Sequence, residues 1–275
     1  MVELRKNLKE TSRIAPAEEL RMTGDYHVHT FFSPCADARM SYHNILDAAE
    51  AAGLEEIGLT DHPFHDGLAE HHEHLFLARR RTASRARVWI GAELEVVGPG
   101  RLALSRKQLP RADYLIASPS HYDVERHPPV AHLNRPDEWA ERMIADMENV
   151  PGSEASVIAH PFFVYALLVA APNGAVRLPG IADIVNAMSP RRLAIMLEKL
   201  AAARLALEIS PRIGFTPAFT LFMEYLYNEA RKYNMRFSLG SDSHRPPTIG
   251  RLGAAQVFAD RLGLRPEEIW RPDAA

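Results

Sequence analysis

Imidazole and carboxylate side chains recur along this chain at the ends of short apolar segments. They stand in the motifs HVH, TDH, GAE, SH, AHP and SDSH, whose metal-binding types are His27, His29, His62, Glu93, His121, His160, Asp242 and His244. Imidazole nitrogens and carboxylate oxygens are the ligands that zinc, manganese and iron accept in proteins. The pattern therefore indicates a centre that holds more than one metal ion.

The HVH motif shows how one segment could supply two ligands. Alternation along a strand points His27 and His29 to the same side, so both imidazoles can bind one ion. Such a pair alone is a modest indication, because chance or core packing also produces it. The indication becomes strong when seven strand-like segments each end in a candidate ligand, since independent coincidences would have to multiply.

Strand-sized and helix-sized segments alternate in seven rounds, the pattern of parallel βα units. The expected strands are residues 25–29, 56–60, 88–95, 114–117, 156–159, 205–209 and 236–239. The expected helices are residues 41–52, 70–87, one from Pro136, one from Pro190 behind the cap Ser189, and 218–233. The sequence thus predicts a seven-stranded α/β barrel, similar to a TIM barrel, whose active site lies at the C-terminal rim.

The chain reads as one domain. We expect the barrel over residues 25–265, an N-terminal arm over 1–24 and a peripheral tail over 266–275, because no linker separates a second domain. Residues 96–104, which contain a Gly-Pro turn, are expected to form a hairpin inserted into the barrel pattern.

Composition excludes several classes of protein. Of the 275 residues 47% are hydrophobic and 24% are charged, so a disordered or fibrous chain is excluded. A formal charge of -3 argues against a surface that attracts nucleic acid or anionic membrane all over. The single cysteine, Cys35, excludes an internal disulfide framework. The first 22 residues are too charged for a signal peptide, and no apolar stretch has membrane-spanning length, so we expect a cytoplasmic protein.

From residue 25 to about residue 250, the motifs resemble in order and residue type those of the polymerase and histidinol phosphatase (PHP) family of metal-dependent phosphoesterases. The resemblance implies a distorted barrel of seven βα units with two or three divalent ions, zinc, manganese or iron, at its rim. It also implies eight of the nine usual ligands, namely His27, His29, His62, Glu93, His121, His160, Asp242 and His244. Asp37, in the loop after HVH, stands where family members have the ninth ligand. Cys35 beside it is expected to be a small buried residue.

The resemblance implies roles as well. Glu93 is the bridging carboxylate, and Glu93, Asp242 and His244 are the catalytic residues of an attack on phosphorus by metal-activated hydroxide. Asp61 is interpreted either as a residue that orients an imidazole or as the cap of a turn. Arg212 and Arg245 are candidates for binding the substrate phosphate, with solvated loop arginines as the alternative. Glu208 ends the sixth strand-like segment, and Ser210 replaces the asparagine that family members often have there.

Other basic clusters carry less weight. The run HHEH with His71, His72 and His74 is interpreted as a solvated helical face rather than a metal site. The five arginines of residues 79–87 are expected on a salt-bridged or solvated exterior, with a contact to RNA or DNA as the alternative. The loop histidines His65, His127 and His132 are candidates for the proton donor to the leaving group.

These observations favour a metal-dependent phosphoesterase that acts on a phosphate monoester or on the end of a nucleotide or oligonucleotide. The expected partner is that small phosphorylated substrate, without a membrane or an obligate protein partner. Three alternatives stay open: histidinol phosphatase proper, an amidohydrolase-like enzyme that cleaves a C–N bond, and a non-catalytic module stabilised by metal. An amidohydrolase typically has eight strands and often a bridging lysine, and neither is visible in the sequence. Degenerate modules lose rim ligands, which this chain keeps.

Overall fold

The computed structural model describes residues 20–63, 66–119, 135–163, 180–210 and 216–273. Within them seven strands pair in parallel with their neighbours, in the order β1-β2-β3-β5-β6-β7-β8. Their bounds are Gly24–Val28 for β1, Glu56–Asp61 for β2, Arg87–Gly98 for β3, Tyr114–Ser118 for β5, Val157–Ile158 for β6, Ala206–Ile209 for β7 and Phe237–Leu239 for β8. The predicted seven-stranded, TIM-like barrel is thereby confirmed, and all seven expected strands are present.

The barrel is closed between its first and last strands by the end of β1 and the segment that follows β8. Val28 and Ser243 form an isolated parallel bridge. In this bridge the His29 N–H donates to the carbonyl of Ser243 (2.9 Å), and the Ser243 N–H donates to the carbonyl of His27 (3.3 Å). The buried carboxylate of Asp25 accepts the Ser241 N–H (2.8 Å). The seam of the barrel therefore runs through the segment that contains the SDSH motif.

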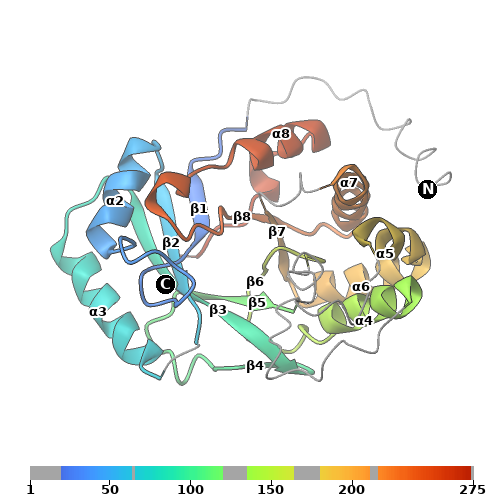
Figure 1. Cartoon of the computed structure of the whole chain (residues 1–275), viewed down its shortest axis with the longest axis horizontal. Helices are drawn as coiled ribbons and strands as arrows, with labels where there is room; N and C mark the ends of the chain where they lie inside the picture. The colour runs from blue at the N-terminus through green and yellow to red at the C-terminus, as the bar shows by residue number, and fades with distance from the viewer. Residues whose placement is uncertain (1–19, 64–65, 120–134, 164–179, 211–215, 274–275) are drawn as a thin grey trace, which may run out of the picture.

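Helices surround the strands, with α2 and α3 on one side and α4 to α7 on the other (Figure 1). Prolines begin α4, α6 and α7, where a missing N–H costs nothing, and Ser189 caps α6 as predicted. No helix of the described ranges is both long and apolar enough to cross a membrane. The helices are α2 (Tyr42–Ala51), α3 (Leu68–Arg81), α4 (Pro136–Glu148), α5 (Ile181–Ala187), α6 (Pro190–Ala202), α7 (Pro217–Lys232) and α8 (Gly253–Leu262), with 3-10 turns η4 (Pro246–Thr248) and η5 (Pro266–Glu268).

The predicted end of α3 was wrong. The sequence favoured a helix to residue 87, but α3 ends at Arg81 and Thr82 is extended. Residues 82–86 carry the chain to β3, and the Ala86 N–H bonds to the Ser84 hydroxyl (3.1 Å). A β-branched residue and a serine that bonds the local backbone both disfavour helix continuation. The expected hairpin is confirmed, because β4 (Arg101–Leu102) pairs antiparallel with β3.

Two residues close to the C-terminus are part of the core. Residues 266–275 were expected to form a peripheral tail, yet Ile269 and Trp270 are buried. The Trp270 N–H donates to the carbonyl of Phe237 (2.8 Å), and its indole meets the rings of Tyr26 and Tyr114 edge-on at 5.8 and 5.4 Å. Phe237 is the first residue of β8, so this contact lies at the end of the barrel opposite the ligand-bearing rim. Trp270 therefore fills that end.

Candidate metal centre

The carboxylate of Glu93 on β3 lies among imidazoles from three other strands. Its Oε2 is 3.0 Å from Nε2 of His27, 3.3 Å from Nε2 of His29 and 3.4 Å from Nε2 of His62. Its Oε1 is 2.9 Å from Nε2 of His160 and accepts a hydrogen bond from the Ser118 hydroxyl. All these side chains are buried. One carboxylate therefore has nitrogen ligands around both of its oxygens.

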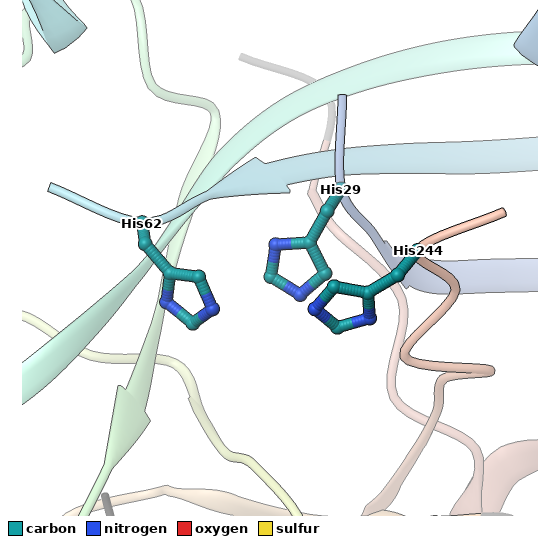
Figure 2. Close-up of side chains that lie close together, drawn as sticks. All are labelled: His29, His62 and His244. Carbon is teal, nitrogen blue, oxygen red and sulfur yellow. The ribbon is translucent and has the colours of Figure 1, made fainter. Parts of the chain in front are cut away.

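The loop after β8 adds two groups to this cluster. Asp242 Oδ1 lies 3.2 Å from Nε2 of His29 and 3.7 Å from Nε2 of His27. The His244 ring stacks on His29 with centroids 4.2 Å apart, and His29 stacks on His62 at 4.5 Å. Figure 2 shows these three rings side by side, each entering from a different segment of the chain. The segment after β8 thus places Asp242 and His244 beside candidate ligands at the ends of β1 and β2.

The donor set fits divalent metal ions. Two groups have their ligand atoms within 4.8 Å of one another: His27, His29, Glu93 and Asp242, and His29, His62 and His244. Metal–ligand bonds of about 2.1 Å in a tetrahedron place the ligand atoms about 3.4 Å apart. The separations of 3.0 to 3.7 Å around Glu93 and Asp242 agree with that spacing. Nitrogen and oxygen donors without sulfur favour zinc, manganese or iron(II) over soft metals.

An unusual backbone conformation sets the direction of two candidate ligands. Asp242 has a φ of 51° and His160 a φ of 24°, both in the left-handed region. Asp and His are among the few non-glycine residues that are enriched there, and such strain gathers at functional sites. A sharp change of direction directly after a strand is how both side chains come to the rim.

Glu208 holds the first imidazole in place. Its Oε1 is 2.7 Å from Nδ1 of His27, and its Oε2 accepts the His160 N–H at 2.7 Å. Burial lowers the pKa of His27, but the carboxylates of Glu208, Glu93 and Asp242 outweigh burial and raise it well above its ordinary value. Because a carboxylate accepts hydrogen bonds, Nδ1 carries the proton and Nε2 faces Glu93. Sequence reasoning noted this residue only as the end of a strand.

Asp61 is the centre of a second buried network. It accepts the Thr30 N–H (2.8 Å) and the hydroxyls of Thr30 (2.7 Å) and Ser33 (2.6 Å), and it lies 3.1 Å from Nε2 of His71. Burial alone would raise its pKa, but His71, His29 and Ser33 lower it to about 2. Ser33 links Asp61 to Nδ1 of His29, and the contact with His71 agrees with the interpretation of Asp61 as a residue that orients an imidazole. The sequence gave no signal for the intervening Ser33.

Asp37 and Cys35 do not join either ligand group. The Asp37 carboxylate pairs with Arg39 (2.7 Å), although its backbone N–H donates to the carbonyl of His244 (2.9 Å). Cys35 is exposed, so the expectation of a buried residue was wrong. Cys35 lies in the loop between β1 and α2 rather than on an element of the core. Arg245, directly after His244, is exposed.

His121, Arg212 and the loop histidines His65, His127 and His132 lie outside the described residues.

The HHEH interpretation was wrong for two of its three histidines. His71 and His72 are buried, while His74 is exposed. His71 bonds the Asp61 network and stacks on Phe32 (4.4 Å), and the helix turns both rings toward the barrel. The arginines of the following run agree with a salt-bridged exterior: Arg79 pairs with Asp113 (2.5 Å) and Arg87 lies over the Trp89 ring (4.0 Å).

Comparisons with known proteins agree with this geometry. The family model described as "PHP domain" matches residues 25–212. A protein of Syntrophotalea carbinolica named "Probable phosphatase" is 23% identical over 259 residues, which are 91% of this chain and 92% of that protein. The crystal structure of histidinol phosphate phosphatase from Lactococcus lactis, complexed with zinc, L-histidinol and phosphate, has a similar fold. Its TM-score is 0.62 at 20% identity, covering 88% of this chain and 94% of that one. Because the family model matches more than half of the chain and spans most of the barrel, this chain belongs to the PHP domain family.

Proposed function

We propose that this protein is a metal-dependent phosphoesterase that hydrolyses a phosphate monoester or the terminal phosphoester of a nucleotide or oligonucleotide. The observation that carries the proposal is the buried Glu93 carboxylate, whose Oε2 lies within 3.4 Å of Nε2 of His27, His29 and His62. Three nitrogens converge on one oxygen, and the seam loop adds Asp242. A buried cluster of this kind is stabilised when cations lie between its members.

The proposed ligands are His27, His29, Asp37, His62, Glu93, His121, His160, Asp242 and His244, which would hold two or three ions of zinc, manganese or iron. When bound, such ions polarise a phosphate and lower the pKa of a water nucleophile. Glu93 is the proposed bridge, because its two oxygens face different imidazoles. Asp242 and His244 are proposed to hold the attacking water. Asp37 would join only after leaving Arg39, a surface pair that costs little to break.

The chain's own cations are proposed to bind the phosphate oxygens. Arg245 follows His244 directly, and its exposed guanidinium is accessible to a substrate. Arg212 follows β7 by three residues and is the second candidate. A guanidinium suits this task because its fork matches two phosphate oxygens. We expect Arg245→Ala chiefly to raise KM, since the contact is made to substrate and transition state alike.

The competing functions have less support. An amidohydrolase-like barrel typically has eight parallel strands, whereas seven form the barrel in the described part of this chain. A non-catalytic module would lose rim ligands, whereas the described part of this chain keeps its candidates. The substrate of the Lactococcus lactis neighbour makes L-histidinol phosphate the first monoester to test.

The experiment is hydrolysis by the full chain loaded separately with Mn²⁺, Zn²⁺ or Fe²⁺. The substrates are a panel of phosphate monoesters that includes L-histidinol phosphate, a set of short 5′-phosphorylated oligonucleotides, and p-nitrophenyl phosphate to report the reaction class. We expect turnover that a chelator abolishes, and a loss of at least about 100-fold in kcat for His29→Ala. His74→Ala is the matched control, because His74 is exposed on α3. Equal rates for the two variants, or no turnover with any ion, would contradict the proposal.

A further inference from the structure

The hydroxyl of Ser33 lies at a junction next to the candidate metal centre. It is 2.6 Å from Oδ1 of Asp61, 3.1 Å from the backbone nitrogen of His62 and 3.3 Å from Nδ1 of His29. Ser33 and His29 are fully buried, and so is Asp61. Water therefore cannot substitute for any of these contacts without rearrangement of the core.

Counting protons fixes the direction of each hydrogen bond. The His62 N–H can only donate, so the Ser33 oxygen accepts it. Asp61 Oδ1 already accepts the Thr30 N–H (2.8 Å). The single proton of the Ser33 hydroxyl therefore points to Asp61, and the second lone pair of its oxygen faces His29. That lone pair requires a proton on Nδ1 of His29.

The second carboxylate oxygen of Asp61, Oδ2, also accepts hydrogen bonds. The Thr30 hydroxyl donates to its Oδ2 (2.7 Å), and Nε2 of His71 on α3 lies 3.1 Å from the same oxygen. His71 also lies 3.0 Å from the Thr30 hydroxyl and is stacked on Phe32. The carboxylate thus has a fixed orientation, with each oxygen facing two donors.

A competing interaction exists at the other ring nitrogen of His29. Nε2 lies 3.2 Å from Asp242 Oδ1 and 3.3 Å from Glu93 Oε2. Two carboxylate oxygens at that distance attract a proton to Nε2, which would then have no lone pair for a metal ion. The contact with Ser33 opposes this, because it is favourable only when Nδ1 is the protonated nitrogen.

We propose that Ser33, oriented by Asp61, is the positioning residue that keeps the ring proton of His29 on Nδ1 and so leaves Nε2 free to bind metal. The inference rests on the proposed function for its purpose but concerns metal binding alone. It assigns the Asp61 network, including His71, to the support of one imidazole.

The test compares Ser33→Ala with Thr30→Val, both at fully buried positions. Each removes one hydroxyl bonded to Asp61, but only Ser33 also touches an imidazole ligand. Zinc affinity is measured by competition with a chromophoric chelator. We expect a loss of roughly 10-fold or more for Ser33→Ala and less than about 3-fold for Thr30→Val. Equal losses for the two variants would mean general loosening and would overturn the proposal.

A second readout does not depend on zinc or on activity. Long-range ¹H–¹⁵N spectra of the metal-free full chain at mildly alkaline pH report which ring nitrogen of each histidine carries the proton. The His29 signals are assigned by their loss in His29→Gln. We expect protonated Nδ1 in the natural chain and a shift toward protonated Nε2 in Ser33→Ala.

The natural chain alone can refute the idea, even if Ser33→Ala does not fold. A deprotonated Nδ1 in its metal-free form overturns the proposal. Failure to hydrolyse any phosphate ester, with both readouts as expected, would instead overturn the proposed function and leave the role of Ser33 standing.

Discussion

His27 and His29 leave the same strand two residues apart, yet the structure supports them in different ways. His27 bonds a carboxylate directly, through the 2.7 Å contact with Glu208. His29 reaches its carboxylate, Asp61, through the hydroxyl of Ser33. A direct anion makes an imidazole more basic and a stronger ligand, whereas a hydroxyl mainly sets its orientation and tautomer. His27 is therefore supported by the charge of a carboxylate, and His29 by the geometry of a hydrogen bond to a hydroxyl.

Glu208→Gln should have the largest effect, because it removes the direct charge. Both groups that face Glu208 are donors, Nδ1 of His27 and the His160 N–H, so the glutamine amide must turn its NH₂ toward one of them. The backbone N–H cannot change roles, and His27 would then lose its proton from Nδ1. We expect about 100-fold weaker zinc binding, measured by chelator competition. Glu198→Gln, at an exposed position of α6, is the control. A loss smaller than that of Ser33→Ala would reverse the comparison.

Gly240→Ala should affect the same side by crowding rather than by charge. A Cβ at this position would lie 2.0 Å from Oε1 of Glu208 and 2.5 Å from Cβ of His27. We expect roughly 10-fold weaker zinc binding and a loss of about 1–3 kcal/mol in the free energy of unfolding, measured by urea denaturation. Gly253→Ala is the control, because a Cβ there meets open space. If the two variants bind zinc equally, the fit around Glu208 does not matter.

His71→Phe should have a smaller effect, on the other side. Phenylalanine keeps the stacking on Phe32 but removes the contact with Asp61, while Thr30 and Ser33 still hold that carboxylate. We expect about 3-fold weaker zinc binding. His74→Phe on the same helix serves as the control. A loss as large as that for Glu208→Gln would show that the two networks are equally demanding.

His72 provides a contrast to His71, because we expect its substitution to leave zinc binding unchanged at neutral pH. It is buried beside His71, and burial lowers its pKa to about 4. A folded-state pKa below the unfolded value of about 6.5 means that the unfolded chain takes up the proton first. Its contribution is therefore complete above pH 6.5, falls as the pH drops toward 4 and levels off below.

The measurement for His72 is the free energy of unfolding of the metal-free chain against pH, compared with His72→Leu. The difference between the two proteins should change by up to about 3 kcal/mol across this window. Parallel curves would mean that His72 is not the group responsible.

The sequence predicts the barrel well because the imidazole and carboxylate side chains stand at the ends of the expected strands. Hydrophobic periodicity locates the strands, and a parallel barrel has only one rim at which Glu93 and His62 can meet. What the sequence does not reveal are contacts that join distant segments through ordinary residues. Ser33 stands in a loop with no periodic signal, and its partner Asp61 is 28 residues away.

Two errors have a common physical cause. His71 and His72 belong to a polar-looking helix start, and Trp270 belongs to a charged, proline-bearing tail. Composition predicts solvent exposure for both segments, but burial is decided by what lies opposite. His71 finds an anion, and Trp270 finds the open end of the barrel. Glu208 differs from these residues, because a glutamate at the end of a strand-like segment is a signal that the sequence does contain.

Ser243, which closes the barrel against Val28, stands between Asp242 and His244. The proposed metal centre would therefore be complete only after the segment that follows β8 has docked on β1, although His27 and His29 come early in the chain. Ions bound there would in turn fasten the two edges of the sheet together.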